Sequence, residues 1–187
     1  MNRETFWEIV ERSRAEVGDT RHASSAATVA RHLVAQLTAL GPSTAVEFQH
    51  VYDSLDQETY RWDLWAAAYL MRGGCSDDGF DYFRGWLIAQ GRAVWEQAVA
   101  DPDSLAGVGV DPDDDLVECE EMVAAAGDAH AASTGDDEAF WEALEQTEGD
   151  DEPTASADPA GEDFDFDDDE QMRARLPRLA AIYRPAQ

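Results

Sequence analysis

The stretch RGGCSDDGFDYFRGWLIAQGR, residues 72–92, predicts a buried helix with a well-defined start. Ser76 follows two glycines, and its hydroxyl can accept a hydrogen bond from the backbone of the first helical turn. Asp77 and Asp78 come next, where the helix macrodipole favours negative charge. Apolar side chains then recur at helical spacing, namely Phe80, Tyr82, Phe83, Trp86 and Leu87. We therefore expect a capped helix whose aromatic side chains are buried.

The same stretch can also be interpreted as a chemical site. Asp77, Asp78 and Asp81 lie near the glycine turn, and oxygen ligands of this kind can hold a hard cation. Their spacing does not match an EF-hand loop and no histidine is close in sequence, so we predict no metal site and no cofactor. Cys75 precedes the helix N-terminus, where a thiol can have a lowered pKa. Arg84 can pair with Asp81 on one helix face. The five candidate catalytic residues are therefore Cys75, Asp77, Asp78, Asp81 and Arg84.

Helical periodicity runs along most of the 187-residue chain, and strand signals are nearly absent. The length fits one domain. Helices are expected within residues 3–17, 24–40, 45–60, 61–72, 72–92, 91–100 and 113–130. We therefore predict a compact all-α domain of about seven helices.

The net charge of −28 is concentrated in one part of the chain. Residues 93–172 hold 28 of the 41 acidic residues and no arginine. Around residues 148–170 the composition shifts to Asp, Glu, Pro, Ala, Gly and Ser, which buries too little apolar area to offset the entropy of ordering. We predict a helical domain over 1–147 and an acidic, low-complexity flexible segment over 148–170 that is disordered or loosely docked. Residues 171–187 are expected to return to the helical body.

Several classes of protein are not indicated by the sequence. No run of about eighteen apolar residues predicts a transmembrane helix, and the N-terminus lacks the apolar region of a signal peptide. Two cysteines are too few for a disulfide framework, so we expect reduced thiols and a cytoplasmic protein. Basic residues are not clustered, so we expect no direct binding to nucleic acid. The oligomeric state stays open.

The chain resembles a known bacterial family. The motifs that carry the resemblance occur in this order: FWEIVERSR (6–14), YRWDLWAAAYLMRGGCSDDGFDYFRGWLIAQGR (60–92), ADPDSLA (100–106), ECEEM (118–122) and RLPRLAAIYRP (175–185). They are similar to the bacterial domain-of-unknown-function 4240 family over most of the chain, excluding the acidic stretch. The resemblance implies a bacterial soluble domain and carries over no activity and no functional residue.

The favoured function is a binding or adaptor module that captures a basic protein partner with the acidic segment. Long-range attraction would speed such an encounter. Phe164 and Phe166 lie among carboxylates, a composition typical of interaction segments, and Tyr60 and Trp62 are further candidate binding residues. A solubilising linker is the other interpretation of the acidic segment.

Two other functions stay open at this point. The first is a small enzyme or tailoring factor with a carboxylate-lined site around residues 75–84, which requires that these carboxylates converge on a cavity. The second is an acidic mimic of nucleic acid, which requires carboxylates at fixed spacing on a rigid surface. The sequence does not decide whether the protein is an enzyme.

Overall fold

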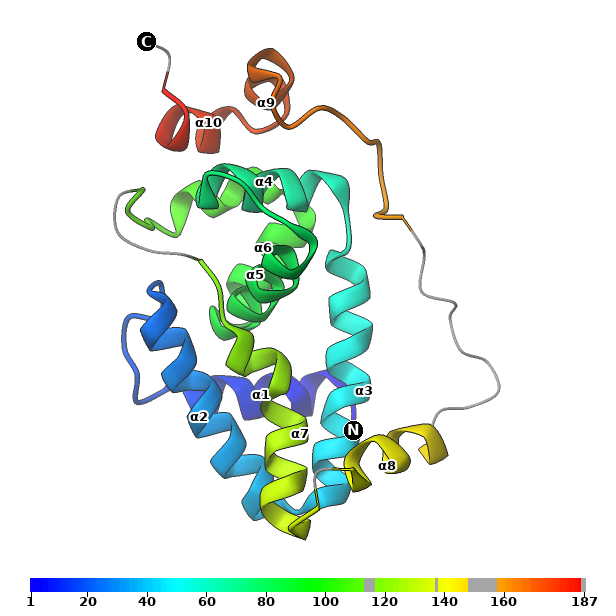
Figure 1. Cartoon of the computed structure of the whole chain (residues 1–187). Coiled ribbons are helices and arrows are strands. Elements are labelled where there is room, and N and C mark those ends of the chain that lie inside the picture. Colours follow the sequence, from blue (N-terminus) through cyan, green and yellow to red (C-terminus); the bar gives the residue numbers. More distant parts are fainter. Residues whose placement is uncertain (113–116, 137, 148–157, 186–187) are drawn as a thin grey trace.

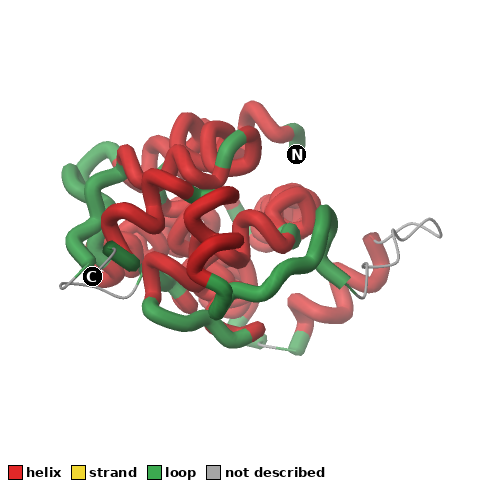
Figure 2. The backbone as a smooth tube through the Cα atoms, turned by 90° about the horizontal axis from the view of Figure 1, so that it is seen from above, coloured by secondary structure: helices red, strands yellow, loops and turns green. Residues whose placement is uncertain are grey.

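The computed structural model describes residues 1–112, 117–136, 138–147 and 158–185, and within them the fold is all-α. Its helices are α1 (Arg3–Arg14), α2 (Ala23–Leu40), α3 (Pro42–Thr59), α4 (Trp62–Arg72), α5 (Asp77–Ala89), α6 (Arg92–Ala100), η1 (Pro102–Gly107), α7 (Glu120–Thr134), α8 (Ala139–Thr147), α9 (Asp169–Arg175) and α10 (Pro177–Tyr183). Figure 2 shows these helices joined by loops, with no strand in the described part of the chain.

The predicted fold class is confirmed, but the predicted number of about seven helices is wrong. The described residues form ten α-helices and the 3₁₀-helix η1. Five of these elements, α6, η1, α8, α9 and α10, have only six to nine residues. Such short helices show few repeats of the apolar pattern, so periodicity is a weak signal for them, and of the five only α6 is among the seven predicted helices.

Helix α7 packs against α2, α3 and α5. Figure 1 shows α1, α2 and α7 towards one end of the molecule and α4, α9 and α10 at the other, with α3 running between the two ends and leading into α4. The last helix, α10, contacts α4, η1 and α9. None of the helices in the described part has the length and hydropathy that crossing a bilayer demands.

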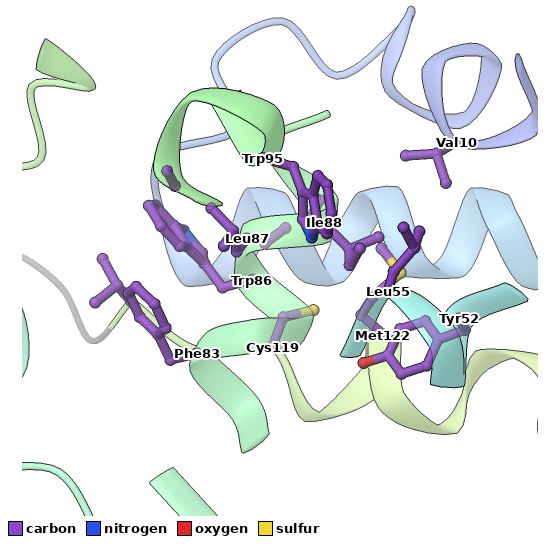
Figure 3. Packing of buried hydrophobic residues seen from close by; sticks show 14 of the residues in the cluster. Val10, Tyr52, Leu55, Phe83, Trp86, Leu87, Ile88, Trp95, Cys119 and Met122 are labelled. Atoms are coloured by element: carbon purple, nitrogen blue, oxygen red, sulfur yellow. The ribbon is translucent and has the colours of Figure 1, made fainter. Parts of the chain in front are cut away.

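Helix α5 is the capped, buried helix that the sequence predicts. The Ser76 hydroxyl accepts a hydrogen bond from the Gly79 backbone at 3.2 Å, and the Phe83 and Trp86 side chains are fully buried. Figure 3 shows Phe83, Trp86 and Leu87 among the buried side chains that surround this helix. A Cβ atom at Gly85 would lie 2.5 Å from the backbone oxygen of Cys119. Glycine is therefore needed here for the close approach of α5 to the start of α7.

The C-terminal helices are attached through a buried carboxylate. The Asp103 side chain, 6% exposed, accepts hydrogen bonds from the backbone N–H groups of Arg178 and Leu179 at the start of α10. Leu179 is fully buried. This part of the chain therefore belongs to the packed core.

Residues 158–168 directly precede α9. We call them the docked segment, because they contact α4. The backbone of Ala160 pairs with Arg61 in an isolated parallel bridge. Residues 148–157, the first part of the predicted flexible segment, lie outside the described residues. The boundaries of that segment therefore stay predictions.

Candidate functional site

A cleft of about 540 Å³ opens between α3, α5 and the start of α4. It is lined by four carboxylates, one guanidinium group and two aromatic rings: Asp53, Asp56, Asp77, Asp81, Arg84, Tyr60 and Trp65. Its size is in the range of ordinary small-molecule sites. The carboxylates that the sequence groups around residues 75–84 thus converge in part on a cavity.

Helical spacing accounts for how these carboxylates come to face one another. Asp53 and Asp56 are three residues apart on α3, and Asp77 and Asp81 are four apart on α5. Side chains at these spacings share one face of a helix. Because α3 and α5 both border the cleft, two pairs of carboxylates from distant parts of the chain meet there.

Arg84 is the central cation of the cleft. Its side chain is only 8% exposed and donates to the Asp56 carboxylate at 2.7 Å and to the Asp56 backbone oxygen at 3.1 Å. It also donates to the Asp81 carboxylate, which confirms the predicted pair within α5. The guanidinium group lies over the rings of Tyr60 and Phe80, 5.2 and 5.0 Å from their centroids. Arg84 therefore ties α3 to α5 through charge-assisted bonds and cation–π contacts.

Asp56 is the carboxylate whose acidity the cleft changes most. Burial raises the pKa of Asp56 from 3.8 to about 6. Arg84 opposes this shift, whereas the negative charges of Asp81 and Asp53 add to it. A carboxylate with a pKa in this range can exchange a proton near neutral pH.

Two of the five candidate catalytic residues do not line the cleft. Asp78 is exposed in the first turn of α5. Cys75 lies directly before this helix and is partly buried, and burial raises its pKa from 9.0 to about 11. The nearby Arg72 opposes that shift without overcoming it. A thiol with such a pKa is a poor nucleophile at neutral pH.

The four candidate binding residues fall into two neighbouring places. Tyr60 lines the cleft. Trp62 stacks on Trp65, with ring centroids 5.7 Å apart, and also meets the ring of Phe166 at 6.0 Å. Phe164 contacts Phe166 at 5.1 Å. Trp62 and the two phenylalanines therefore form an aromatic cluster next to the cleft, between α4 and the docked segment.

Several cleft residues carried no clear signal in the sequence. Asp53 and Asp56 look like the solvated face of an amphipathic helix, and Trp65 looks like a core residue of α4. Ala160 also lines the cleft, although nothing about an alanine in an acidic segment indicates such a place. In the part of the chain that the structure describes, no three His, Cys, Asp or Glu side chains are grouped so that they could hold a metal ion.

Fold and cleft together define an all-α domain with a predominantly acidic cleft. A family model described as "Protein of unknown function (DUF4240)" matches residues 1–132. The chain therefore belongs to this family. The matched region includes every cleft residue on α3, α4 and α5, but not the docked segment. No curated protein and no solved structure matches the chain.

Proposed function

We propose that this protein is a binding module for a basic protein partner, and that the cleft receives a positively charged side chain of that partner. The observation that carries the proposal is the charge balance of the cleft. Four carboxylates face one arginine, and this arginine is already bound to Asp56 and Asp81. The carboxylates of Asp53 and Asp77 are exposed and make no ion pair with Arg84 among the described contacts, although Asp53 accepts a hydrogen bond from the Gln49 amide at 2.7 Å. Asp77 and the second oxygen of Asp53 are available to a cation from outside.

The aromatic lining favours an arginine as the side chain that enters. A guanidinium group can stack on an aromatic ring and bind carboxylates through parallel hydrogen bonds. The chain itself contains this combination, because Arg84 lies over Tyr60 while it donates to Asp56. Trp65 and Asp77 also line the cleft, although the ring of Trp65 already stacks on those of Trp62 and Phe80.

The docked segment adds negative charge beside the cleft. Six of its eleven residues are acidic: Asp158, Glu162, Asp163, Asp165, Asp167 and Asp168. Charges that lie outside the contact itself mainly accelerate the encounter, and salt weakens their effect. The partner would therefore carry several basic residues, of which one enters the cleft.

A calorimetric titration with a peptide of alternating arginine and glycine tests this proposal. The same peptide with citrulline in place of arginine removes the charge and keeps the shape. We expect the arginine peptide to bind the wild-type protein, and the double variant Asp53→Asn with Asp77→Asn to bind it at least about tenfold more weakly. The citrulline peptide should not bind.

A matched control separates the cleft from the overall charge. Asp128 and Glu142 are exposed carboxylates on α7 and α8, and Asp128→Asn with Glu142→Gln removes the same net charge away from the cleft. Equal losses of affinity in the two double variants would mean that the peptide only senses the net charge. That result, or no binding to the wild-type protein, would contradict the proposal.

A small enzyme is the second candidate, and the raised pKa of Asp56 favours it. A buried carboxylate with a pKa of about 6 is suited to general acid–base catalysis. A screen of hydrolase and transferase substrates with cationic groups tests this candidate. An activity that changes around pH 6 and is absent from Asp56→Asn would support it. The nucleic-acid mimic stays a prediction.

A further inference from the structure

The docked segment completes the cleft through two backbone hydrogen bonds. The Ala160 N–H donates to the Tyr60 oxygen at 2.9 Å, and the Ala160 oxygen accepts from the Trp62 N–H at 3.0 Å. These bonds hold Ala160 at the junction between α3 and α4, where it forms part of the cleft wall. The wall on this side of the cleft therefore exists only while the segment is docked.

Side chains hold the same segment at two further places. Phe164, only 9% exposed, meets the ring of Phe166 and the guanidinium group of Arg175 on α9, and Phe166 lies against α4. The ring of Phe166 lies 5.4 Å from that of Tyr69 and 6.0 Å from that of Trp62. The Tyr69 hydroxyl donates to the Asp167 carboxylate at 2.6 Å. Phe166 is half-buried, whereas Tyr69 and Trp62 are partly exposed even with the segment in place. This contact is small compared with the packing of a core helix.

The attachment of α10 to the body is much stronger. Asp103, Leu179 and Ala180 are all buried, and the Asp103 carboxylate accepts both backbone N–H groups at the start of the helix. Regions with few buried contacts open at a lower free-energy cost than the core, while the rest of the protein stays folded. Figure 1 shows that the segment leads directly into α9. To leave α4 while α10 remains in place, it has to break the hydrogen bond that Arg184, directly after α10, donates to the Phe166 oxygen at 3.0 Å.

The segment can be docked on α4, which is the closed state, or detached from it, which is the open state. Charge gives these two states different affinities for a cation. In the closed state an acidic segment lies beside a cleft that already holds an excess of carboxylates. Mutual repulsion therefore disfavours closure when the cleft is empty. A bound cation offsets this repulsion and also gains the wall that Ala160 provides. A ligand shifts a conformational equilibrium only through such a difference in affinity.

We propose that the docked segment is a strap that opens and closes over the cleft while the helices stay folded, and that a cation in the cleft favours the closed state. The coupling to a ligand rests on the proposed function of the cleft. The opening of the segment does not, since it follows from the small number of contacts that hold the segment against α4.

Hydrogen exchange of individual backbone amides, followed by NMR, tests this mechanism. The amides of Ala160 and Trp62 report the strap, and the Ala180 amide, bonded to the Leu176 oxygen at 2.8 Å, reports α10. We expect the two strap amides to exchange at least about tenfold faster than that of Ala180. Addition of the arginine–glycine peptide should slow their exchange, and so should added sodium chloride, which screens the repulsion.

Phe166→Ala provides the matched perturbation. It should speed exchange at Ala160 and Trp62 by at least about tenfold and leave Ala180 unchanged, which also shows that the variant is folded. Ile182→Ala removes an exposed apolar side chain on α10 and should leave the strap amides unaffected.

Each failure has a distinct meaning. Exchange of Ala160 and Trp62 at the rate of Ala180 would show that the segment leaves only when the protein unfolds, and would overturn the strap. Peptide binding without slower exchange would overturn the coupling. Absence of peptide binding would contradict the proposed function, while the exchange rates and their salt dependence still decide whether a charge-controlled strap exists.

Discussion

Two stretches of this chain place phenylalanines among aspartates, and they have different structures. GFDYF, residues 79–83, lies in the buried helix α5, whereas DFDFD, residues 163–167, lies in the docked segment and enters a turn at Phe166 and Asp167. The phenylalanines are three residues apart in the first stretch and two apart in the second. A spacing of three continues into the apolar face of a helix, whereas a spacing of two does not fit the helical period. Spacing, more than composition, separates a core helix from a strap.

The two stretches also differ in where their neighbouring arginines come from. Helix α5 contains its own cation, Arg84, which binds a carboxylate of its helix and one of α3. The docked segment contains no arginine, and cations from neighbouring helices compensate for only part of its charge. Arg184 donates to the Phe166 oxygen at 3.0 Å, and Arg175 pairs with Glu162 at 3.0 Å while lying 4.2 Å from the centre of the Phe164 ring. The order of the segment therefore depends on α9 and the residues around α10.

Removal of an aromatic side chain from α5 should have the largest effect. Phe83→Ala or Trp86→Ala leaves a cavity in the core and should lower the free energy of unfolding by about 3–5 kcal/mol. Denaturant unfolding followed by circular dichroism measures this change. Trp141→Ala on α8 is the control, since Trp141 is 67% exposed and should change stability by about 0.5 kcal/mol or less. Equal effects would contradict the assignment of α5 as the core helix.

The burial of Asp56 should make stability depend on pH in a defined direction. Its pKa is about 6 in the folded protein and near the ordinary 3.8 when unfolded. Between these values the folded state holds a proton that the unfolded state has lost, so raising the pH from about 4 to about 6 removes stability. Asp56→Asn cannot titrate. We therefore expect the stability of the variant minus that of the wild type to rise by up to about 2 kcal/mol as the pH is raised from about 4 to about 6.

The same pH series with Asp128→Asn serves as the control for Asp56. Asp128 is exposed on α7, and its replacement removes one negative charge away from the cleft. The same pH dependence in both variants would show that the effect of Asp56→Asn comes from net charge and not from burial in the cleft.

Phe166→Ala should cost less than either change in α5, about 1–2 kcal/mol, because the ring is half-buried. Thermal unfolding of Phe166→Ala and Phe83→Ala side by side measures the contrast between the two phenylalanine stretches. A loss as large as that of Phe83→Ala would place the docked segment in the core and would contradict its weak attachment.

The sequence predicts the local features of α5 and misses the contacts between distant segments. The Ser76 cap, the pair of Asp81 with Arg84 and the burial of Phe83 all follow from spacing within one helix. Asp56 and Arg84 are 28 residues apart in the sequence, and they meet only because the tertiary fold brings α3 and α5 together at the cleft. Ala160 reaches Tyr60 through backbone atoms, which carry no side-chain signal. The contacts of Asp56 and Ala160 in the site therefore depend on tertiary structure, which the spacing within one helix does not reveal.

The smallest expected effects concern two exposed carboxylates, one in the first turn of α5 and one in the docked segment, and they differ in sign. Asp78 lies in the first turn of α5, where it interacts favourably with the helix macrodipole, so Asp78→Asn should lower stability by up to about 1 kcal/mol. Asp163 lies among the carboxylates of the docked segment, so Asp163→Asn should relieve repulsion and leave stability unchanged or slightly higher. Thermal melts at low salt measure both differences, and added salt should shrink both. A loss in both variants would show that the charges of the segment stabilise its docking, and would contradict the repulsion that the strap requires.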